Sequence, residues 1–203
     1  MISNNDLIRH LINTGALSSK NIIEAFKNID RADFVYDPSV SDVYEDYPLQ
    51  IGYRQTISQP TTVAMMLEML SPRKGQKVLD IGSGSGWTTA LLSFIVGDRG
   101  SVVGVERVEE LVGFGGVNLN KYGFYNSKII QAGNKLGIPG EKFDRILVSA
   151  AADEFPIELT EQLKNNGKLV IPISSSIYEI TKKENAEVEV IEHYGFTFVP
   201  LIY

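Results

Sequence analysis

The stretch VLDIGSGSGW, residues 78–87, decides how the surrounding chain folds. The run KVLDI before the glycines is short, apolar and partly β-branched, which predicts a buried strand over residues 77–81. The run WTTALLSFIV that follows has its apolar residues at helical spacing, which predicts a helix over residues 87–96. The three glycines of the stretch therefore lie in a strand-to-helix turn: Gly82, Gly84 and Gly86.

A glycine-rich turn of this kind is typical of nucleotide-binding sites. Its backbone N–H groups and the positive end of the helix dipole face the ligand, and glycine lets the backbone approach closely. A dinucleotide site needs a third glycine where Trp87 stands, so a dehydrogenase is the least favoured interpretation. The spacing G-x-G-x-G, with Asp80 two residues before Gly82, resembles the first motif of S-adenosylmethionine-dependent methyltransferases. An ordinary βα turn would also accept these residues, so a second feature is needed.

A second strand that ends in a carboxylate is that feature. The run SVVGVE, residues 101–106, predicts a strand ending at Glu106. In nucleotide-binding βαβ units an acidic residue about 20 positions after the glycines binds the ribose hydroxyls. A carboxylate accepts two hydrogen bonds and a ribose diol offers two donors, so Glu106 is favoured as the ribose-binding residue. The alternative is a solvated glutamate at a helix start, since ERVEEL begins a helix.

Composition narrows the possible chemistry. The chain has 203 residues, 43% of them hydrophobic, which is enough for one large α/β domain. It has no cysteine, so disulfides, thiolate metal sites and a cysteine nucleophile are excluded. Its two histidines, His10 and His193, are far apart, which argues against a zinc site and a Ser-His-Asp hydrolase. We therefore expect no metal.

Charge and hydropathy narrow the possible partners. The net charge is −6 and the sequence pI is about 5.0, which does not suit a nucleic-acid-binding protein. No segment approaches the roughly 20 apolar residues of a membrane span. The N-terminus is amphipathic but lacks the continuous apolar core of a secretory signal. These observations predict a cytoplasmic protein that binds neither nucleic acid nor membrane. The absence of an unexplained apolar stripe predicts a monomer.

Apolar runs and helical patterns alternate along the middle of the chain. We expect strands near residues 77–81, 101–105, 127–131, 144–149 and 168–173. We expect helices near residues 5–14, 19–29, 61–70, 87–96, 107–121 and 156–164. This order predicts an α/β fold with a mainly parallel, twisted sheet and helices on both faces. An N-terminal helical extension precedes the sheet, and antiparallel C-terminal strands close one edge of it.

The predicted topology also locates the ligand. Ligands of such folds bind outside the carboxyl ends of the strands. Residues 82–86, Glu106 and the segments after Ile130 and Val148 should therefore surround one crevice.

A long segment before the sheet identifies a family. The runs YEDYPLQIGYRQTISQP, TTVAMMLEML and VLDIGSGSGW resemble the protein-L-isoaspartate O-methyltransferases. FDRILVSAAADEFPIELTEQLKNNGKLVIPI and FTFVPL are similar to that family's later strands and substrate loop, so the resemblance covers nearly the whole chain. It implies a Rossmann-like methyltransferase fold in a single domain. The implied parts are N-terminal helices with the substrate loop, a cofactor-binding core and C-terminal strands: residues 1–75, 76–173 and 174–203.

The resemblance also implies an activity. The family transfers a methyl group from S-adenosyl-L-methionine to the α-carboxyl group of an isoaspartyl residue, leaving S-adenosyl-L-homocysteine. The ester cyclises to a succinimide whose hydrolysis returns part of it to aspartate, so the substrates are damaged, isoaspartyl-containing peptides and proteins. A carboxylate is already ionised at neutral pH because its pKa is about 4, so alignment can supply most of the catalysis.

Site residues follow from the family's motifs. The serine of T-I-S implies that Ser58 holds the substrate carboxylate; without the family it would be a turn or N-cap residue. The expected cofactor-binding residues are Asp80, Gly82, Ser83, Gly84, Ser85, Gly86, Glu106, Arg107, Gly133 and Asn134. The expected substrate-binding residues are Thr56, Ile57, Ser58, Gln59, Pro60, Val148, Ser149, Ala150 and Ala151. For the last four, close packing at a strand end is an equal alternative.

Two stretches depart from the family pattern. The family usually carries an aspartate near the adenine amino group where this chain has Gly133, and Asn134 is the adjacent side chain that could accept from adenine. The expected helix 107–121 contains Gly113, Gly115 and Gly116, each costing roughly 1 kcal/mol relative to alanine. That helix is either loose or closely packed on a neighbour.

These departures leave two other functions open. One is a carboxyl methyltransferase that acts on a dedicated peptide or protein, favoured by Thr61 and Thr62, where some relatives carry a histidine. The other is a protein that binds S-adenosylmethionine without catalysis, favoured by Gly133.

Overall fold

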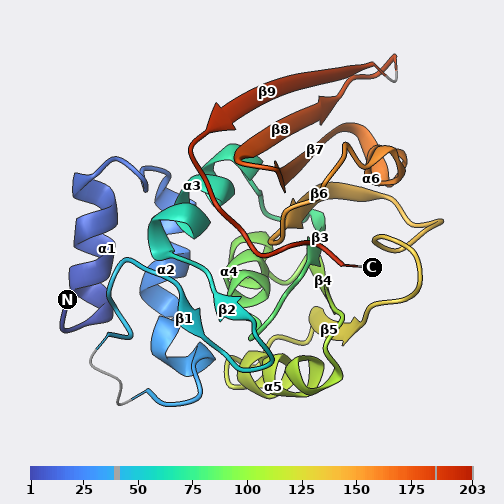
Figure 1. Cartoon of the computed structure of the whole chain (residues 1–203). Helices are drawn as coiled ribbons and strands as arrows, with labels where there is room; N and C mark the ends of the chain where they lie inside the picture. Colours follow the sequence, from blue (N-terminus) through green and yellow to red (C-terminus); the bar gives the residue numbers. More distant parts are fainter. Residues whose placement is uncertain (39–41, 186, 203) are drawn as a thin grey trace.

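A computed structural model describes residues 1–38, 42–185 and 187–202 of the chain (Figure 1). Residues 39–41, 186 and 203 lie outside the described residues.

Helices and strands alternate as the sequence predicts. The helices are α1 (Asn4–Asn13), α2 (Lys20–Asn28), the 3₁₀ helix η1 (Arg31–Phe34), α3 (Pro60–Leu70), α4 (Trp87–Val96), α5 (Glu109–Asn120) and α6 (Ile157–Glu161). The first strands are β1 (Leu49–Gln50), β2 (Thr56–Ile57), β3 (Lys77–Ile81), β4 (Ser101–Glu106) and β5 (Ser127–Gln131). The later strands are β6 (Phe143–Val148), β7 (Leu163–Ile173), β8 (Ser176–Lys182) and β9 (Val188–Tyr194).

Seven strands form one sheet in the order β5-β4-β3-β6-β7-β8-β9. Strands β3 to β7 pair in parallel, whereas β7–β8 and β8–β9 pair antiparallel. The mainly parallel sheet with an antiparallel C-terminal edge is therefore confirmed. A separate two-stranded hairpin, β1–β2, lies beside the carboxyl ends of the parallel strands (Figure 1).

Helices lie on both faces of the sheet, but not equally. Helices α1 to α5 share one apolar core with one face, represented by Val78, Val102 and Val170. The other face is covered by α6 and by the loop around Leu136. The connection from β5 to β6 has no helix, because residues 132–142 contain three glycines and a proline and lack apolar periodicity.

One predicted helix end and one predicted strand differ from the structure. The helix expected over residues 156–164 ends at Glu161, because Leu163 pairs with Phe143 as the first residue of β7. Leu159 and Leu163 have helical spacing, but the second of them is a strand residue of the same core. The expected terminal strand FVPL forms only a bridge: Ala151 donates to the Val199 carbonyl at 2.8 Å and accepts from the Leu201 N–H at 2.7 Å.

Candidate active site

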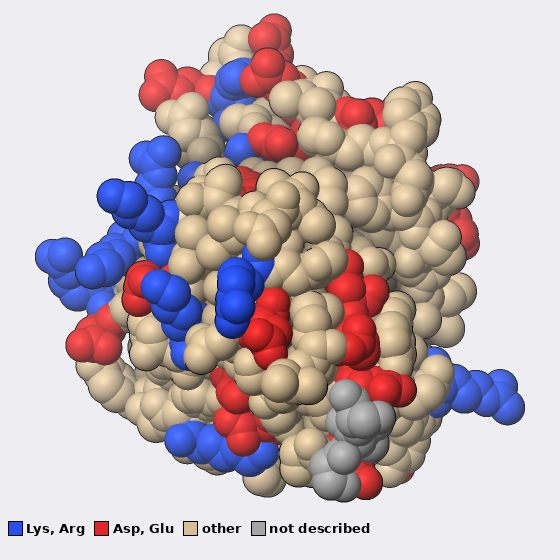
Figure 2. Space-filling model, turned by 90° about the vertical axis from the view of Figure 1, so that its left-hand side faces the viewer, with Lys and Arg blue, Asp and Glu red and all other residues tan. Residues whose placement is uncertain are grey.

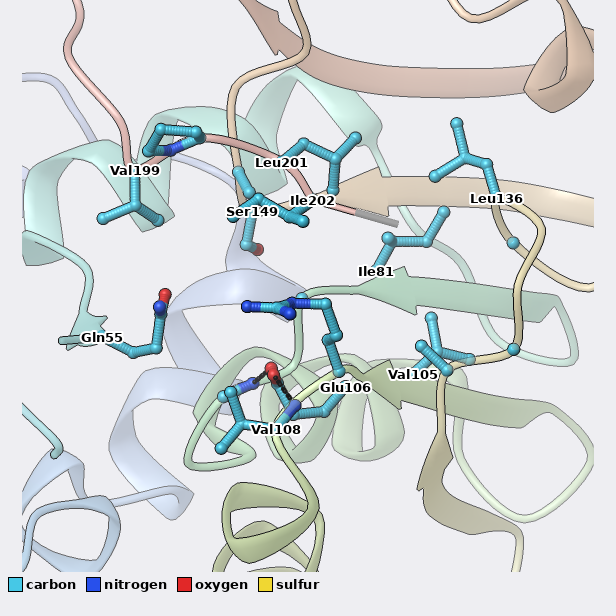
Figure 3. A pocket seen from close by; sticks show the side chains of 18 of the residues that line it. Gln55, Ile81, Val105, Glu106, Val108, Leu136, Ser149, Val199, Leu201 and Ile202 are labelled. Carbon is cyan, nitrogen blue, oxygen red and sulfur yellow. Dashed lines mark hydrogen bonds between the residues drawn. The ribbon is translucent and has the colours of Figure 1, made fainter. Parts of the chain in front are cut away.

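A pocket opens at the carboxyl ends of β3 and β4, as the topology predicts (Figure 3). The sequence-predicted residues that line it are Thr56, Gly82, Gly84, Glu106, Arg107, Gly133, Ser149 and Ala150. The lining also includes residues that the sequence did not indicate: Gln55, Ile81, Val105, Val108, Ala132, Lys135, Leu136, Gly137 and the C-terminal residues Val199, Pro200, Leu201 and Ile202. Figure 3 shows the C-terminal side chains on one side of the pocket and Glu106 and Val108 on the other.

The glycine turn has the backbone that its sequence predicts but uses its amides differently. Gly82, Gly84 and Gly86 have φ of +77°, +52° and +92°, the region that favours glycine. The N–H groups of Gly82 and Ser83 donate to the Val105 carbonyl, and that of Gly86 donates to the Ser83 carbonyl. The Gly84 N–H donates to Glu106. These four amides are therefore bound within the protein rather than open to a ligand, which corrects the expectation for the turn.

Glu106 joins the glycine turn to α5. One carboxylate oxygen accepts from the Gly84 N–H and the other from the Val108 N–H, each at 2.9 Å (Figure 3). The residue is only 7% exposed, and it lines the pocket. A carboxylate has about four lone-pair sites, so roughly two remain for a ligand with adjacent hydroxyl groups.

Asp80 lies behind the turn rather than in the pocket. Its Oδ2 accepts from the Thr88 hydroxyl at 2.7 Å and from the Thr89 hydroxyl at 2.6 Å, and the residue is fully buried. It is not one of the residues that line the pocket. Its position corrects the expectation that it contacts a ligand: it holds the first turn of α4 against β3. Burial raises the pKa of Asp80 to about 6, although the two hydroxyl groups oppose that shift.

The raised pKa predicts a specific pH dependence of stability. In the unfolded chain Asp80 has its ordinary pKa of 3.8, so folding favours the protonated form. The stability that this group contributes is complete below pH 3.8 and is lost as the pH rises through about 6. Asp80→Asn removes this dependence. As the pH rises from 3.5 to 7.5, the unfolding free energy of Asp80→Asn relative to that of the parent protein should increase by about 2–3 kcal/mol.

Urea unfolding of both proteins across this pH range measures the difference, and titrations common to both cancel. Asp144→Asn is the matched control, because ion pairing and hydrogen bonds from Lys164 and Lys77 lower the pKa of Asp144 despite its partial burial. For Asp144→Asn the difference from the parent protein should have the opposite sign and should appear only at the acid end of the range, because a lowered pKa acts on stability below pH 3.8. A difference for Asp80→Asn that is flat with pH would contradict the prediction.

The loop after β5 is held by a residue that the sequence analysis missed. Gly133, Leu136 and Gly137 line the pocket, whereas Asn134 lines a neighbouring groove on the side of α6. Asn134 is therefore not placed as expected. Gln162, 4% exposed, accepts from the Ile138 N–H at 2.7 Å and donates to the Leu136 carbonyl at 2.9 Å. The one sign of this role in the sequence is that Gln162 is polar but lies between Leu159 and Leu163 on an otherwise apolar stripe.

Ser58 lines two further cavities. It lines a narrow cavity together with residues 82–85 of the glycine turn and with Trp87 and Thr88 at the start of α4. It also lines an open groove whose other lining residues are Pro48, Thr56, Gln59, Thr62, Ser149, Thr197, Phe198 and Val199. Ser58 is not an N-cap: α3 starts at Pro60 with Gln59 in the cap position. A ligand group in the groove could therefore contact Ser58 and the glycine turn together.

Some of the remaining expected substrate-binding residues line the pocket, and others are buried in the protein core. Ser149 lines the pocket, the narrow cavity and the groove, and Ala150 lines the pocket. Ala151 instead pairs with the C-terminal segment. Val148 is fully buried in the core, and Pro60 is buried at the start of α3. For Val148 close packing is therefore what the structure shows.

Beneath Ser58 lies a buried cation that the sequence analysis missed. Arg31 donates to the carbonyls of Val43 at 2.6 Å, Glu45 at 3.1 Å, Tyr47 at 3.0 Å and Ser58 at 3.2 Å. It is fully buried, and its guanidinium lies 5.5 Å from the Trp87 ring centroid. Burial lowers the pKa of Arg31 to about 10, so it remains charged at neutral pH.

Within the described ranges, no three histidine, aspartate or glutamate side chains come together as a metal-binding group. Within the same ranges, no helix has the length and apolarity needed to cross a membrane.

Comparison with known proteins identifies relatives over the full length of the chain. The sequence model of the protein-L-isoaspartate(D-aspartate) O-methyltransferase family matches residues 2–203. Protein-L-isoaspartate O-methyltransferase of Methanopyrus kandleri is 40% identical over 97% of this chain and 89% of its own length. The Thermococcus onnurineus enzyme of the same name is 41% identical over 96% and 91%. A solved Plasmodium falciparum structure, in complex with S-adenosyl-L-homocysteine, superposes with a TM-score of 0.88 and 28% identity over 98% of both chains.

Proposed function

The chain belongs to the protein-L-isoaspartate(D-aspartate) O-methyltransferase family, and from that premise we propose which of its residues carry out the methyl transfer. As a member of this family it is an S-adenosylmethionine-dependent enzyme whose substrates are isoaspartyl residues of proteins. The assignment of roles rests on one observation: Ser58 lies between the glycine turn and an open groove.

The pocket suits S-adenosylmethionine in its chemistry. Glu106 has lone-pair sites left for the ribose diol after it binds Gly84 and Val108. Val105, Val108 and Leu136 offer apolar surface for the adenine ring, and the hydroxyl-lined cavity beside Ser83 and Ser85 suits the polar methionine end. Arg107 and Gly133 complete the lining. We assign the ribose to Glu106 and the adenine to the apolar wall.

The residues around the groove then have only to align the reactants. When bound, S-adenosylmethionine supplies an electrophilic methyl group on a sulfonium. An isoaspartyl carboxylate, with a pKa of about 4, is ionised at neutral pH and needs no general base. The Ser58 hydroxyl donates to one carboxylate oxygen and leaves the other free to attack, so catalysis is mostly orientation. Val199 and Leu201 add apolar surface to one wall of the pocket.

We further propose that the chain acts as one domain and as a monomer in the cytoplasm, without nucleic-acid or membrane partners. The net charge of −6 supports the absence of nucleic acid. On the face formed by the N-terminal helices, Lys and Arg gather along one side, with Asp and Glu among and beside them (Figure 2). Sedimentation of the purified protein tests the monomer.

The substrate assignment predicts a strict difference between two peptides that are identical except for one isoaspartyl or aspartyl residue. Incubation with methyl-labelled S-adenosylmethionine should give base-labile methyl ester in the isoaspartyl peptide alone. Ser58→Ala should lower kcat/KM for that peptide roughly 30-fold, since a hydrogen bond to a charged group contributes about 2 kcal/mol.

Ser175→Ala is the matched control, because Ser175 is an exposed serine that does not line the groove. Its kcat/KM should equal that of the parent protein. Equal labelling of both peptides would reject the isoaspartyl specificity, and full activity of Ser58→Ala would reject the role of Ser58.

A further inference from the structure

The three glycines of α5 differ in their surroundings. A β-carbon built on Gly113 or on Gly116 would have no atom within 4 Å. A β-carbon on Gly115 would lie 2.9 Å from the Gly84 carbonyl oxygen and 2.8 Å from Ile129 Cδ1. Glycine at position 115 is therefore required by a close contact, whereas the other two cost helix stability without one.

This contact joins the backbone of α5 to the backbone of the glycine turn. Seen from the turn, a β-carbon on Gly86 would lie 3.0 Å from the Gly115 carbonyl oxygen. Ile129 Cδ1 is the end of a flexible side chain and could move. The Gly84 carbonyl is backbone, so a methyl group at position 115 would have to displace either the helix or the turn.

A hydrogen bond three residues further along α5 reinforces the contact. Asn118, 1% exposed, donates from Nδ2 to the Ser85 carbonyl at 3.1 Å. Residues three apart share one face of a helix, so Gly115 and Asn118 approach the turn together. Glu106 meanwhile holds the Gly84 N–H. The turn is thus held by Glu106 through the Gly84 amide and by Asn118 through the Ser85 carbonyl, while Gly115 leaves room for the Gly84 carbonyl.

We propose that Gly115 and Asn118 are positioning residues for the cofactor: the inner face of α5 sets where Gly84 and Ser85 lie, and through them the affinity for S-adenosylmethionine. This inference rests on the proposed placement of the cofactor in the pocket beside the glycine turn. Neither residue lines that pocket, so each acts through the turn and not by contact.

Three single substitutions of the full-length protein test the proposal: Gly115→Ala, Gly113→Ala and Gly116→Ala. The dissociation constant for S-adenosyl-L-homocysteine is measured by titration calorimetry, and the stability of the ligand-free protein by thermal unfolding. All three changes favour the helix equally. Gly115→Ala should raise the dissociation constant about tenfold, equivalent to about 1.4 kcal/mol. The two controls should leave it unchanged and raise the melting temperature.

Further variants separate positioning from a general loss of structure. Gly115→Ala should raise KM for S-adenosylmethionine and leave KM for the isoaspartyl peptide unchanged. Adding Ile129→Val removes the Cδ1 contact but keeps the Gly84 contact, so the double variant should bind as weakly as Gly115→Ala. If Gly115→Ala does not fold, Asn118→Ala is measured in its place and should weaken binding severalfold.

The outcomes are distinct. Unchanged affinity in a folded Gly115→Ala protein, or full recovery of affinity on adding Ile129→Val, would overturn the proposal. Unchanged affinity of Asn118→Ala would do so if the glycine variant cannot be prepared. A parent protein that does not bind S-adenosyl-L-homocysteine would instead reject the proposed placement of the cofactor.

Discussion

Glu106→Ala is expected to weaken S-adenosyl-L-homocysteine binding roughly 300-fold, the largest effect on affinity of any single substitution in the pocket. Two hydrogen bonds from the ribose to a carboxylate contribute about 3–4 kcal/mol together, because a charged acceptor binds about twice as strongly as a neutral one. The measurement is titration calorimetry of the parent protein and the variant under the same conditions.

The same substitution also removes two hydrogen bonds from the ligand-free protein. Glu106 is the acceptor for the Gly84 and Val108 amides, and both lose their partner in alanine. An unpaired amide costs about 1–3 kcal/mol when buried, so the ligand-free protein should also unfold at a lower temperature. Glu106→Gln retains one acceptor oxygen and should give an intermediate affinity, about 10- to 30-fold below that of the parent protein.

Glu109→Ala is the matched control for charge. Glu109 is an exposed glutamate three residues away, at the first position of α5. Its removal should change neither the affinity nor the melting temperature appreciably. If Glu106→Ala bound the ligand as tightly as Glu109→Ala, the ribose assignment would be wrong.

Glu106 and the glycine turn could be predicted from the sequence because each depends on local order. A strand, a glycine-rich turn, a helix and a second strand follow one another within 30 residues, and such order fixes which strand ends are adjacent. Even here the sequence predicted where a residue lies better than which atoms its side chain contacts. Asp80 is two residues from Gly82, yet alternation along β3 directs its carboxylate to Thr88 and Thr89.

The roles of Gln162 and Arg31 could not be predicted, because the partners that matter for the site are backbone atoms far away in the sequence. Gln162 binds the loop after β5, 24 and 26 residues earlier in the chain. Arg31 binds carbonyls up to 27 residues away. A backbone N–H or carbonyl leaves no mark in the sequence, so Arg31 looks like a solvated residue, and the position of Gln162 on an apolar stripe does not reveal what it binds. The same holds for Gly115, whose neighbour Gly84 belongs to another element.

Arg31→Met is expected to lower the free energy of unfolding by about 3–5 kcal/mol, the largest loss of stability predicted here. Methionine fills much of the same volume but donates no hydrogen bond, so the carbonyls of Val43, Glu45, Tyr47 and Ser58 lose their common donor. Each buried carbonyl left unpaired costs about 1–3 kcal/mol, and some relief comes from water entering the loop. Urea unfolding at neutral pH measures the loss.

The position of the four carbonyls also predicts a kinetic effect. Arg31 ties the segment before the β1–β2 hairpin to Ser58 after it, so its removal frees the residue proposed to align the substrate carboxylate. KM for the isoaspartyl peptide should rise, while the affinity for S-adenosyl-L-homocysteine, set on the opposite side of the pocket by Glu106, should change little. Arg31→Lys keeps the charge but has a single nitrogen for four acceptors. Its loss of unfolding free energy and its rise in KM should therefore be about half as large as those of Arg31→Met.

Arg9→Met controls for the change of residue type, because the Arg9 side chain is 70% exposed and pairs with Asp6 on the surface. A surface pair of this kind contributes about 0–1 kcal/mol, so the control should unfold almost as the parent protein does. If Arg31→Met were as stable as Arg9→Met, the four carbonyls would have other partners in solution. If it were unstable but bound the peptide normally, Arg31 would support the fold without positioning Ser58.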